Sequence, residues 1–373
     1  MEKVFLTDIC DIQYGYAFDS KLFSDTKGKP IIRIRDIVRG YSETYTTEEC
    51  PGDYIIHNDD ILIGMDGEFN IALWKGGEAV LNQRVCKLIP HNEICKNYIF
   101  YYMPIALKAI EDKTPFVTVK HLSAKELNKI ELPLPTYEMQ NRIANSLFNL
   151  DELIEKRKEQ LSKLDELVKA RFVELFGDPI CNSKDMILSP LNDVCTKITD
   201  GTHDTPPRYD SGYLLITGKN IRSSGIIFDD VEFVSEEDHK IIYSRCNPEY
   251  GDVLYTNIGV NYGTACYNNI DYEFSMKNVA LLKPNHRLVN GYYLWECLNI
   301  MRNHILSMNQ VGGAQTFMGL ATIKKITIPV PPIERQNQFA AFVEQTDKSK
   351  LAVQKSLDKL ELLKKALMQK FFE

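Results

Sequence analysis

The sequence has 373 residues, of which 44% are hydrophobic and 25% charged, and its formal net charge is −7. The length suits two or three domains, and the composition is that of an ordinary soluble chain rather than a fibrous or disordered one. The acidic balance argues against a protein that grips nucleic acid unaided, because phosphate binding needs basic side chains. No apolar run is long enough to span a membrane, and the first residues lack the apolar core of a signal peptide.

Cysteine and histidine give no sign of a metal site or a disulfide framework. The nine cysteines are scattered without a Cys-x-x-Cys pair, and the seven histidines show no metal-ligand spacing. An odd, unpatterned set of cysteines is typical of reduced thiols in a cytoplasm. Neither a P-loop nor a Gly-x-Gly-x-x-Gly turn is present. We therefore expect a cytoplasmic binding protein with no catalytic residues, no metal and no cofactor of its own.

Residues 1–135 form a first lobe of short predicted strands. Runs of β-branched and other apolar residues alternate there with Gly, Asn and Asp, which indicates strands joined by turns. Residues 30–37 predict a strand that runs into a turn, and further strands are expected at 60–63 and 81–90. The lobe ends at Pro133 and Pro135, since proline cannot continue a central strand.

Residues 136–177 predict a first long helix. Apolar side chains recur at steps of three and four residues, which is the spacing of a coiled-coil seam. The expected seam residues are Leu147, Leu150, Ile154, Leu161, Leu164 and Val168. Gly177 and Pro179 supply a typical helix stop.

The remainder of the chain repeats this plan. Residues 178–331 form a second lobe, in which 213–221, 252–255 and 275–284 match the strand segments of the first. Residues 332–373 predict a second long helix. Its expected seam residues are Val353, Leu357, Leu360 and Leu367.

The clearest sign of duplication is the stretch where each lobe meets its helix. Residues 130–144 and 326–340 are identical at seven of fifteen positions, at an offset of 196 residues. Both copies contain an Ile-x-x-Pro-x-Pro strand end followed by Glu and then Gln-Asn. A period this long indicates a duplicated domain rather than a solenoid repeat.

The fold class that follows is α+β. It has two similar globular domains separated by two long helices, which form an antiparallel coiled coil. Neither helix is expected to be stable alone in water, and the simplest partner of each is the other copy. The alternative is that both are core helices of one globular domain, although helices of this length are uncommon there.

The duplicated plan resembles the specificity subunit of Type I restriction–modification systems. The resemblance lies in residues 130–140, their copy at 326–336 and the long helix after each. Residues 200–206, Asp-Gly-Thr-His-Asp-Thr-Pro, look like a segment common in that family's target-recognition domains. The first lobe departs from the pattern, having Gln-Tyr-Gly-Tyr-Ala-Phe at residues 13–18 instead.

The resemblance implies a non-catalytic subunit that reads DNA. Residues 1–135 and 178–331 would be target-recognition domains 1 and 2, each reading one half of a split double-stranded sequence, and the helices would set the spacing. Two methyltransferase (modification) subunits that use S-adenosylmethionine would bind the chain, with ATP-dependent restriction subunits joining them in the cytoplasm, for DNA methylation and restriction.

Candidate DNA-binding residues are the polar side chains near strand ends, since loops carry most binding groups and Arg, Lys, Asn and Gln read base edges. The same residue types are also common as solvated charges or turn formers. The candidates are Arg33, Arg35, Gln83, Arg84, Lys120 and His121 in the first lobe, and Thr202, His203, Thr205, Lys219, Asn220, Arg222, Asn257, Asn261 and Gln315 in the second.

Two other functions fit parts of the sequence. A coiled-coil scaffold with two protein-binding lobes would need no DNA readout. An acidic DNA mimic would account for the net charge, but not for the duplication or the polar residues near strand ends. A DNA-specificity subunit accounts for the duplication and for the polar residues near strand ends. It also fits the net charge, provided that its partner subunits supply much of the electrostatic attraction to DNA.

Overall fold

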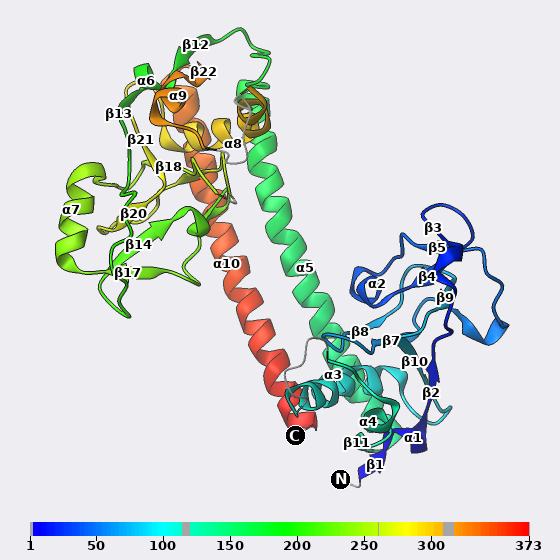
Figure 1. Cartoon of the computed structure of the whole chain (residues 1–373). Coiled ribbons are helices and arrows are strands. Elements are labelled where there is room, and N and C mark those ends of the chain that lie inside the picture. Colours follow the sequence, from blue (N-terminus) through cyan, green and yellow to red (C-terminus); the bar gives the residue numbers. More distant parts are fainter. Residues whose placement is uncertain (1–2, 114–119, 260, 309–316, 373) are drawn as a thin grey trace. The chain divides into compact units, whose positions relative to one another are not determined.

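The computed structural model describes residues 3–113, 120–259, 261–308 and 317–372. The chain divides into two compact units, one made of residues 1–156 with 357–373 and the other of residues 157–356. Each unit therefore contains one lobe together with parts of both long helices (Figure 1). Every helix within the described ranges is too short or too polar to cross a membrane.

The first lobe has two main sheets. The four-stranded sheet has the order β2-β10-β7-β8, and the five-stranded sheet has the order β3-β5-β4-β9-β6. The strands are β1 (Lys3–Phe5), β2 (Cys10–Tyr14), β3 (Phe23–Ser24), β4 (Lys29–Ile32), β5 (Tyr45–Thr46), β6 (Ile55–Ile56), β7 (Ile61–Gly64), β8 (Ile71–Leu73), β9 (Ala79–Leu81), β10 (Val85–Pro90) and β11 (Glu131–Pro133). The helices are α1 (Leu6–Ile9), η1 (Ser20–Leu22), α2 (Ile34–Arg39), η2 (Gly52–Tyr54), α3 (Lys96–Lys113) and α4 (Ala124–Leu127).

The second lobe is built from the same parts. Its four-stranded sheet has the order β13-β21-β18-β19, and a three-stranded sheet has the order β17-β14-β20. The strands are β12 (Ile187–Pro190), β13 (Cys195–Asp200), β14 (Tyr213–Thr217), β15 (Ile221–Arg222), β16 (Gly225–Ile226), β17 (Glu232–Val234), β18 (Val253–Tyr255), β19 (Ala265–Tyr267), β20 (Ser275–Lys277), β21 (Ala280–Pro284) and β22 (Thr327–Val330). The helices are α6 (Leu191–Val194), η3 (Gly218–Asn220), α7 (Glu236–Cys246), α8 (Gly291–Met308) and α9 (Leu320–Lys325).

Strand order confirms the duplication. In each lobe the first long strand, β2 or β13, pairs with the last long strand, β10 or β21, which pairs in turn with β7 or β18. Each lobe also has one parallel pair, β4–β9 or β14–β20. The lobes differ after the first strand of that pair. The turn expected up to residue 37 is wrong, because residues 34–39 form α2, whereas the second lobe has only the short η3 at this point.

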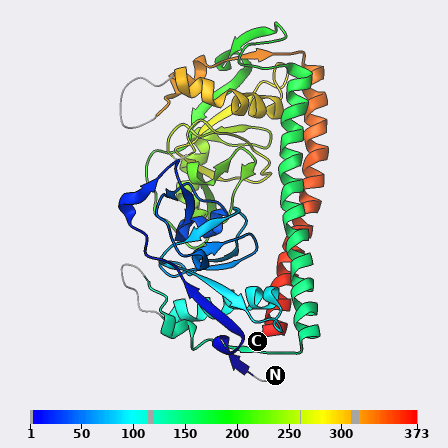
Figure 2. The ribbon, with the colours of Figure 1, turned by 90° about the vertical axis from the view of Figure 1, so that its right-hand side faces the viewer.

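The two long helices are α5 (Tyr137–Phe176) and α10 (Ile333–Phe372), as expected from the periodicity. In the first unit the start of α5 meets the end of α10, where Asp151 forms an ion pair with Lys364. In the second unit the end of α5 meets the start of α10, where Phe172 and Phe339 pack at 5.5 Å between ring centroids. The helices are therefore antiparallel, and Figure 2 shows α10, in orange and red, running alongside α5, in green.

The expected seam residues are turned away from solvent. All ten are buried or half-buried, whereas Leu153, Leu167 and Leu362, which fall outside the predicted seam, are largely exposed. Leu147 and Leu367 pack in the core of the first unit and Val168 in that of the second, so these seam positions are buried by their lobe as well as along the helix pair.

Each long helix is fixed to its lobe by a buried glutamine from the duplicated stretch. Gln140 accepts a hydrogen bond from the Cys95 backbone N–H at 2.9 Å and donates to the Pro135 carbonyl at 2.9 Å. Gln336 makes the equivalent bonds to the backbone of Asn290 and Pro331, at 2.8 and 2.7 Å. Both side chains thus join three elements: the strand that ends at the prolines, the start of the long helix, and the loop before α3 or α8.

A tyrosine reinforces each junction. The Tyr98 hydroxyl donates to the Pro133 carbonyl at 2.6 Å, and the Tyr293 hydroxyl donates to the Pro329 carbonyl at 2.7 Å. Because the glutamine and tyrosine side chains are buried, losing one partner leaves another group unpaired in a largely apolar environment.

Replacing Gln336 with alanine should therefore lower the free energy of unfolding by roughly 2–4 kcal/mol, since the N–H of Asn290 and two carbonyls would lose their partner. Urea unfolding would measure the change. Gln338→Ala is the matched control, because Gln338 is exposed on the same helix turn. Equal stability of the two variants would contradict the structural role of Gln336.

One buried carboxyl group in the second unit, unlike these glutamine and tyrosine side chains, lacks a full set of hydrogen-bond partners. Glu296, on α8, is 3% exposed, and its Oε1 has no hydrogen-bond partner among the described residues. It lines a cavity of about 410 Å³ together with Asp165 and Lys350. Burial raises the pKa of Glu296 to about 7, although Lys169 and Lys350 act in the opposite direction.

This raised pKa predicts how stability changes with pH. Between the unfolded pKa of 4.5 and about 7, the folded state holds a proton that the unfolded state has lost, so stability falls as pH rises through this window. Glu296→Gln, which keeps the protonated shape, should stabilise the protein above pH 7 by roughly 1–3 kcal/mol and change little at pH 5. Thermal unfolding at both pH values is the measurement, and an equal effect at both would contradict the assignment.

Candidate DNA-recognition interface

Parallel strand pairing gathers many of the candidate residues at one edge of each lobe. In the first lobe Ile32 lies opposite Leu81, so Arg33 and Gln83 both follow the carboxyl ends of paired strands. In the second lobe Thr217 lies opposite Lys277, and Lys219 follows in the same way. Candidates that are distant in sequence are therefore neighbours in each fold.

A glycine lets a further loop cross this edge in both lobes. Gly15 and Gly201 each donate to the carbonyl of a valine, Val85 or Val279, at 3.0 and 3.1 Å. A Cβ on Gly15 would lie 1.9 Å from the Asn82 carbonyl oxygen, and a Cβ on Gly201 would lie 2.1 Å from that of Met276. The glycine is thus the shared element of the two loops. In the second lobe this glycine is flanked by Asp200, Thr202 and His203, whereas other residues stand at these positions in the first lobe.

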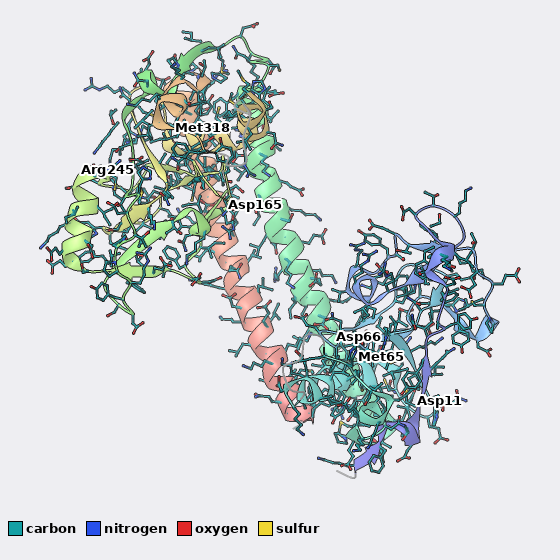
Figure 3. All side chains as sticks on the ribbon, in the orientation of Figure 1. Asp11, Met65, Asp66, Asp165, Arg245 and Met318 are labelled. Carbon is teal, nitrogen blue, oxygen red and sulfur yellow. The ribbon has the colours of Figure 1, made fainter. Side chains whose placement is uncertain are left out.

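In the second lobe a buried aspartate holds the Gly-Thr-His loop. Asp200 is 5% exposed, and its carboxylate contacts Arg245 Nη2 at 2.5 Å and His203 Nε2 at 2.8 Å. The other ring nitrogen of His203, Nδ1, lies 3.0 Å from Asn278 Oδ1. Both ring nitrogens are therefore engaged inside the protein, while the half-exposed ring remains at the surface. Arg245 lies on α7 and is labelled in Figure 3.

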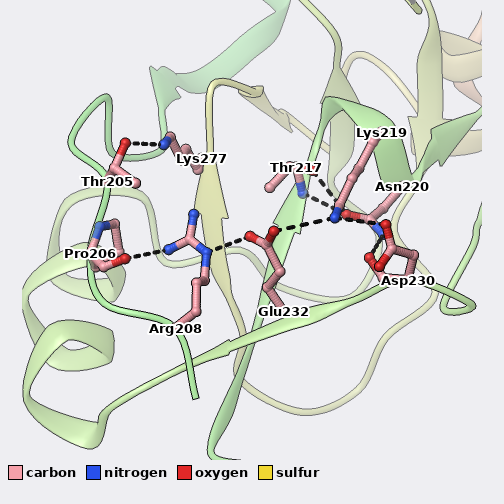
Figure 4. Close-up of polar contacts among 9 residues, drawn as sticks. All are labelled: Thr205, Pro206, Arg208, Thr217, Lys219, Asn220, Asp230, Glu232 and Lys277. Carbon is pink, nitrogen blue, oxygen red and sulfur yellow. Dashed lines mark hydrogen bonds and ion pairs between the residues drawn. The ribbon is translucent and has the colours of Figure 1, made fainter. Parts of the chain in front are cut away.

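Two neighbouring cations of the second lobe, Lys219 and Arg208, face carboxylates (Figure 4). Lys219 Nζ lies 2.9 Å from Asp230 and 3.3 Å from Glu232, and hydrogen bonding to Asp230 raises the pKa of Lys219. Thr205 accepts a hydrogen bond from Lys277, which lies beside it at the same edge.

Four other candidates in the second lobe bond to the protein itself or are buried. Asn220 is 2% exposed, accepts from the Thr217 N–H at 3.0 Å and donates to the Ile227 carbonyl, so its amide holds its own loop. Asn261 donates to the Gly218 carbonyl, and Arg222 donates to the Lys219 carbonyl. Asn257 is 1% exposed, and its amide has no partner among the described residues.

Thr202 and Gln315 are the remaining candidates of the second lobe. Thr202 is half-buried and hydrogen-bonds through its backbone N–H to the Met276 carbonyl, at 2.9 Å. Gln315 lies outside the described residues.

In the first lobe an aspartate again contacts candidate side chains. Asp66 contacts His121 Nδ1 at 2.5 Å and Arg84 Nε at 3.6 Å, which brings these two predicted residues together. Asp66 is labelled in Figure 3. Lys120 instead binds the Glu111 carbonyl at 3.0 Å.

The remaining first-lobe candidates lie on α2 and at its start. Arg35 lies 3.8 Å from Asp36 and donates to Thr44, and Arg33, at the start of α2, is exposed. Asp66, Asp200, Arg245, Lys277 and Asn278 were not among the sequence candidates. Asn278 could have been found, because the repeat matches 275–284 with 81–90 and so sets it against Arg84.

The arrangement offers hydrogen-bonding side chains rather than a reaction centre. No group of three or more potential metal ligands occurs within the described ranges. A family model described as the Type I restriction modification DNA specificity domain matches residues 1–164 and again residues 184–362. The chain belongs to this family. It is a family of DNA-recognition subunits, which assemble with other restriction–modification subunits and are not themselves enzymes.

Known relatives agree over nearly the whole chain. The Type I restriction enzyme EcoBI specificity subunit of Escherichia coli is 26% identical, with 99% of this chain and 85% of the relative covered. The MjaVIII specificity subunit of Methanocaldococcus jannaschii is 21% identical, with 91% and 87% covered.

Solved structures share the fold. The Type I restriction–modification S subunit of M. genitalium matches with a TM-score of 0.63 at 17% identity, covering 100% of this chain and 96% of that one. A second match is a chain from a structure that addresses complex assembly and conformational transition of the type I restriction–modification system. Its TM-score is 0.56 at 18% identity, and the match covers 99% of this chain and 96% of that one.

The close glycine crossings yield a test of the two edges. Gly15→Ala and Gly201→Ala should each destabilise the protein by roughly 1–3 kcal/mol, because backbone atoms must move to admit the methyl group. Gly52→Ala and Gly319→Ala are the controls, since a Cβ there meets no atom within 3.4 Å. Thermal unfolding would compare each pair, and similar losses within a pair would contradict the required close approach.

Proposed function

We propose that each lobe of this DNA-specificity subunit reads one half of a split double-stranded target. The observation that carries the proposal is the repeated edge: both lobes bring a glycine-crossed loop and the ends of a parallel strand pair together. Each edge carries Arg, Lys, His, Asn or Thr side chains of the kind that contact base edges and phosphates.

The long helices suit a spacer. Each has 40 residues, which corresponds to about 60 Å at 1.5 Å per residue. One turn of DNA is about 34–36 Å long, so the helices have the dimensions needed to set a gap of unread base pairs between two half-sites. Their duplicated junctions would also give two identical methyltransferase subunits equivalent docking surfaces, as two-fold assemblies require.

The charge distribution supports DNA binding by this chain together with its partner subunits. Net charge is −7, and several cations at the candidate edges, including Lys219, Arg84 and Arg35, already face carboxylates. Salt-sensitive affinity for DNA grows with the number of phosphates neutralised. The isolated chain should therefore bind DNA weakly, and the modification subunits, carrying S-adenosylmethionine, would supply most of the attraction. ATP-dependent restriction subunits would join this complex for cleavage.

Exchange of one lobe tests independent readout. Replacing residues 179–329 with the corresponding lobe of a related specificity subunit should change one half of the methylated sequence and leave the other half intact. Methylome sequencing of cells that carry the chimera and its modification subunit would report both halves. The reciprocal chimera is the control and should show the complementary change.

Two outcomes would count against the proposal. If both halves changed together, the lobes would not read independently. If the wild-type complex retained DNA without sequence preference, a protein-binding scaffold would be the better description.

A further inference from the structure

A residue with left-handed backbone conformation turns the chain into the central strand of each lobe. Arg84, just before β10, has a φ of 74°, and Asn278, just before Val279 and β21, has a φ of 54°. Six described residues other than glycine have positive φ, and five of them are Asp or Asn, which tolerate this conformation. Arg84 is the exception. We refer to Arg84 and Asn278 as the corner residues.

The two corners are structurally equivalent. Each corner residue is followed by a valine, Val85 or Val279, whose carbonyl accepts from the crossing glycine. The crossing glycine packs against the carbonyl of the residue two positions before each corner, which is Asn82 or Met276. The duplicated fold therefore presents one side chain from the same position in both lobes.

The fold itself does not explain an arginine at this position. Glycine would adopt the corner without strain, whereas a longer side chain in this conformation is unfavourable. The Arg84 side chain is 60% exposed, and its guanidinium lies 3.6 Å from Asp66 Oδ2. A strained backbone position with an exposed side chain is typical of a binding site rather than of a packing role.

We propose, on the basis of the proposed function, that the corner residues are the principal base readers: Arg84 for a guanine in one half-site and Asn278 for an adenine in the other. Arginine pairs with guanine O6 and N7, and asparagine pairs with adenine N6 and N7, each through two hydrogen bonds. These are the two residue types that the equivalent positions carry.

A neighbouring side chain orients each corner residue. Asp66 faces Arg84 Nε, which leaves both Nη groups for the two acceptors of guanine. His203 Nδ1 lies 3.0 Å from Asn278 Oδ1, and His203 is itself held by Asp200. The amide oxygen has a second lone pair for adenine N6–H, and the amide nitrogen has no partner among the described residues, so it can donate to N7. Asp66 and His203 are thus positioning residues.

The decisive experiment removes each side chain while keeping its corner. Arg84→Gly and Asn278→Gly preserve the positive φ, so both lobes should fold, as thermal unfolding would verify. Asp59→Gly and Asp185→Gly are matched controls, because these exposed residues also have positive φ, 70° and 49°, but lie before β7 and β12, away from the corners.

Binding would be measured with the complex of the full chain and its modification subunits. Duplexes would carry the methylated motif or single base-pair changes in it. Each glycine variant should lose about 10- to 100-fold of preference at one base pair, a G·C pair for Arg84 and an A·T pair for Asn278. The controls should retain the wild-type preference. Asn278→Arg should transfer the preference at its base pair to G·C.

The outcomes separate this assignment from the function on which it rests. Unchanged preference in both glycine variants, or a uniform loss over all duplexes as expected for a phosphate contact, would overturn the assignment and leave the lobe-exchange result standing. If Asn278→Gly binds too weakly to score, Asn278→Asp keeps the corner and should switch its base from adenine to cytosine, because a carboxylate accepts from cytosine N4. An adenine preference as strong as that of the wild type in this variant would also overturn it, because a carboxylate cannot donate to adenine N7. Absence of any sequence preference in the wild-type complex would instead reject the proposed function.

Discussion

The buried glutamine at each lobe–helix junction is the interaction on which the rest of the structure depends. A glutamine side chain carries a donor and an acceptor on one planar group, so Gln140 and Gln336 can each tie two backbone segments to the helix that carries them. Inside the protein such bonds are costly to leave unmade, which makes the direction of each helix start a fixed property of its lobe. The prolines before the glutamine end the strand, and the tyrosine of α3 or α8 clamps the carbonyl of one of them.

Away from the junctions the lobes have been free to differ. They share the order of the four-stranded sheet, the parallel pair and the crossing glycine, because these elements bring distant loops to one edge. They differ in the side chains that the edge displays: Asp66, Arg84 and His121 cluster in the first lobe, whereas Asp200, His203 and Asn278 do so in the second. A fixed scaffold with variable loops is a common solution for recognition, since specificity can change without loss of the core.

The sequence predicted the large-scale architecture well because its signals are periodic and repeated. The long helices follow from apolar spacing, and the ten residues predicted for their seam are buried or half-buried. The duplicated strand ends were visible because proline and glutamine recur at a fixed offset.

The site was harder to predict because amide and charged side chains serve internal bonding as readily as recognition. Asn220 and Asn257 are buried, yet in the sequence they look no different from Asn278, which is not. The grouping of Arg84 with Asp66 and His121 depends on pairing between segments that are 18 to 55 residues apart, a relation that no local pattern contains.

The unequal corners have a consequence for symmetry. A pair of identical lobes related by a two-fold axis would read a palindrome, in which each half merely repeats the other. Once both lobes belong to one chain, a substitution in one is not copied into the other, and Arg84 can stand where its counterpart is Asn278. The target then gains a direction, so the two strands of the DNA are distinguishable to a complex whose specificity subunit is built from two similar lobes. Each half also specifies its own base pairs, and the number of different sequences available to the same scaffold grows as the product of the two lobes' repertoires rather than as their sum.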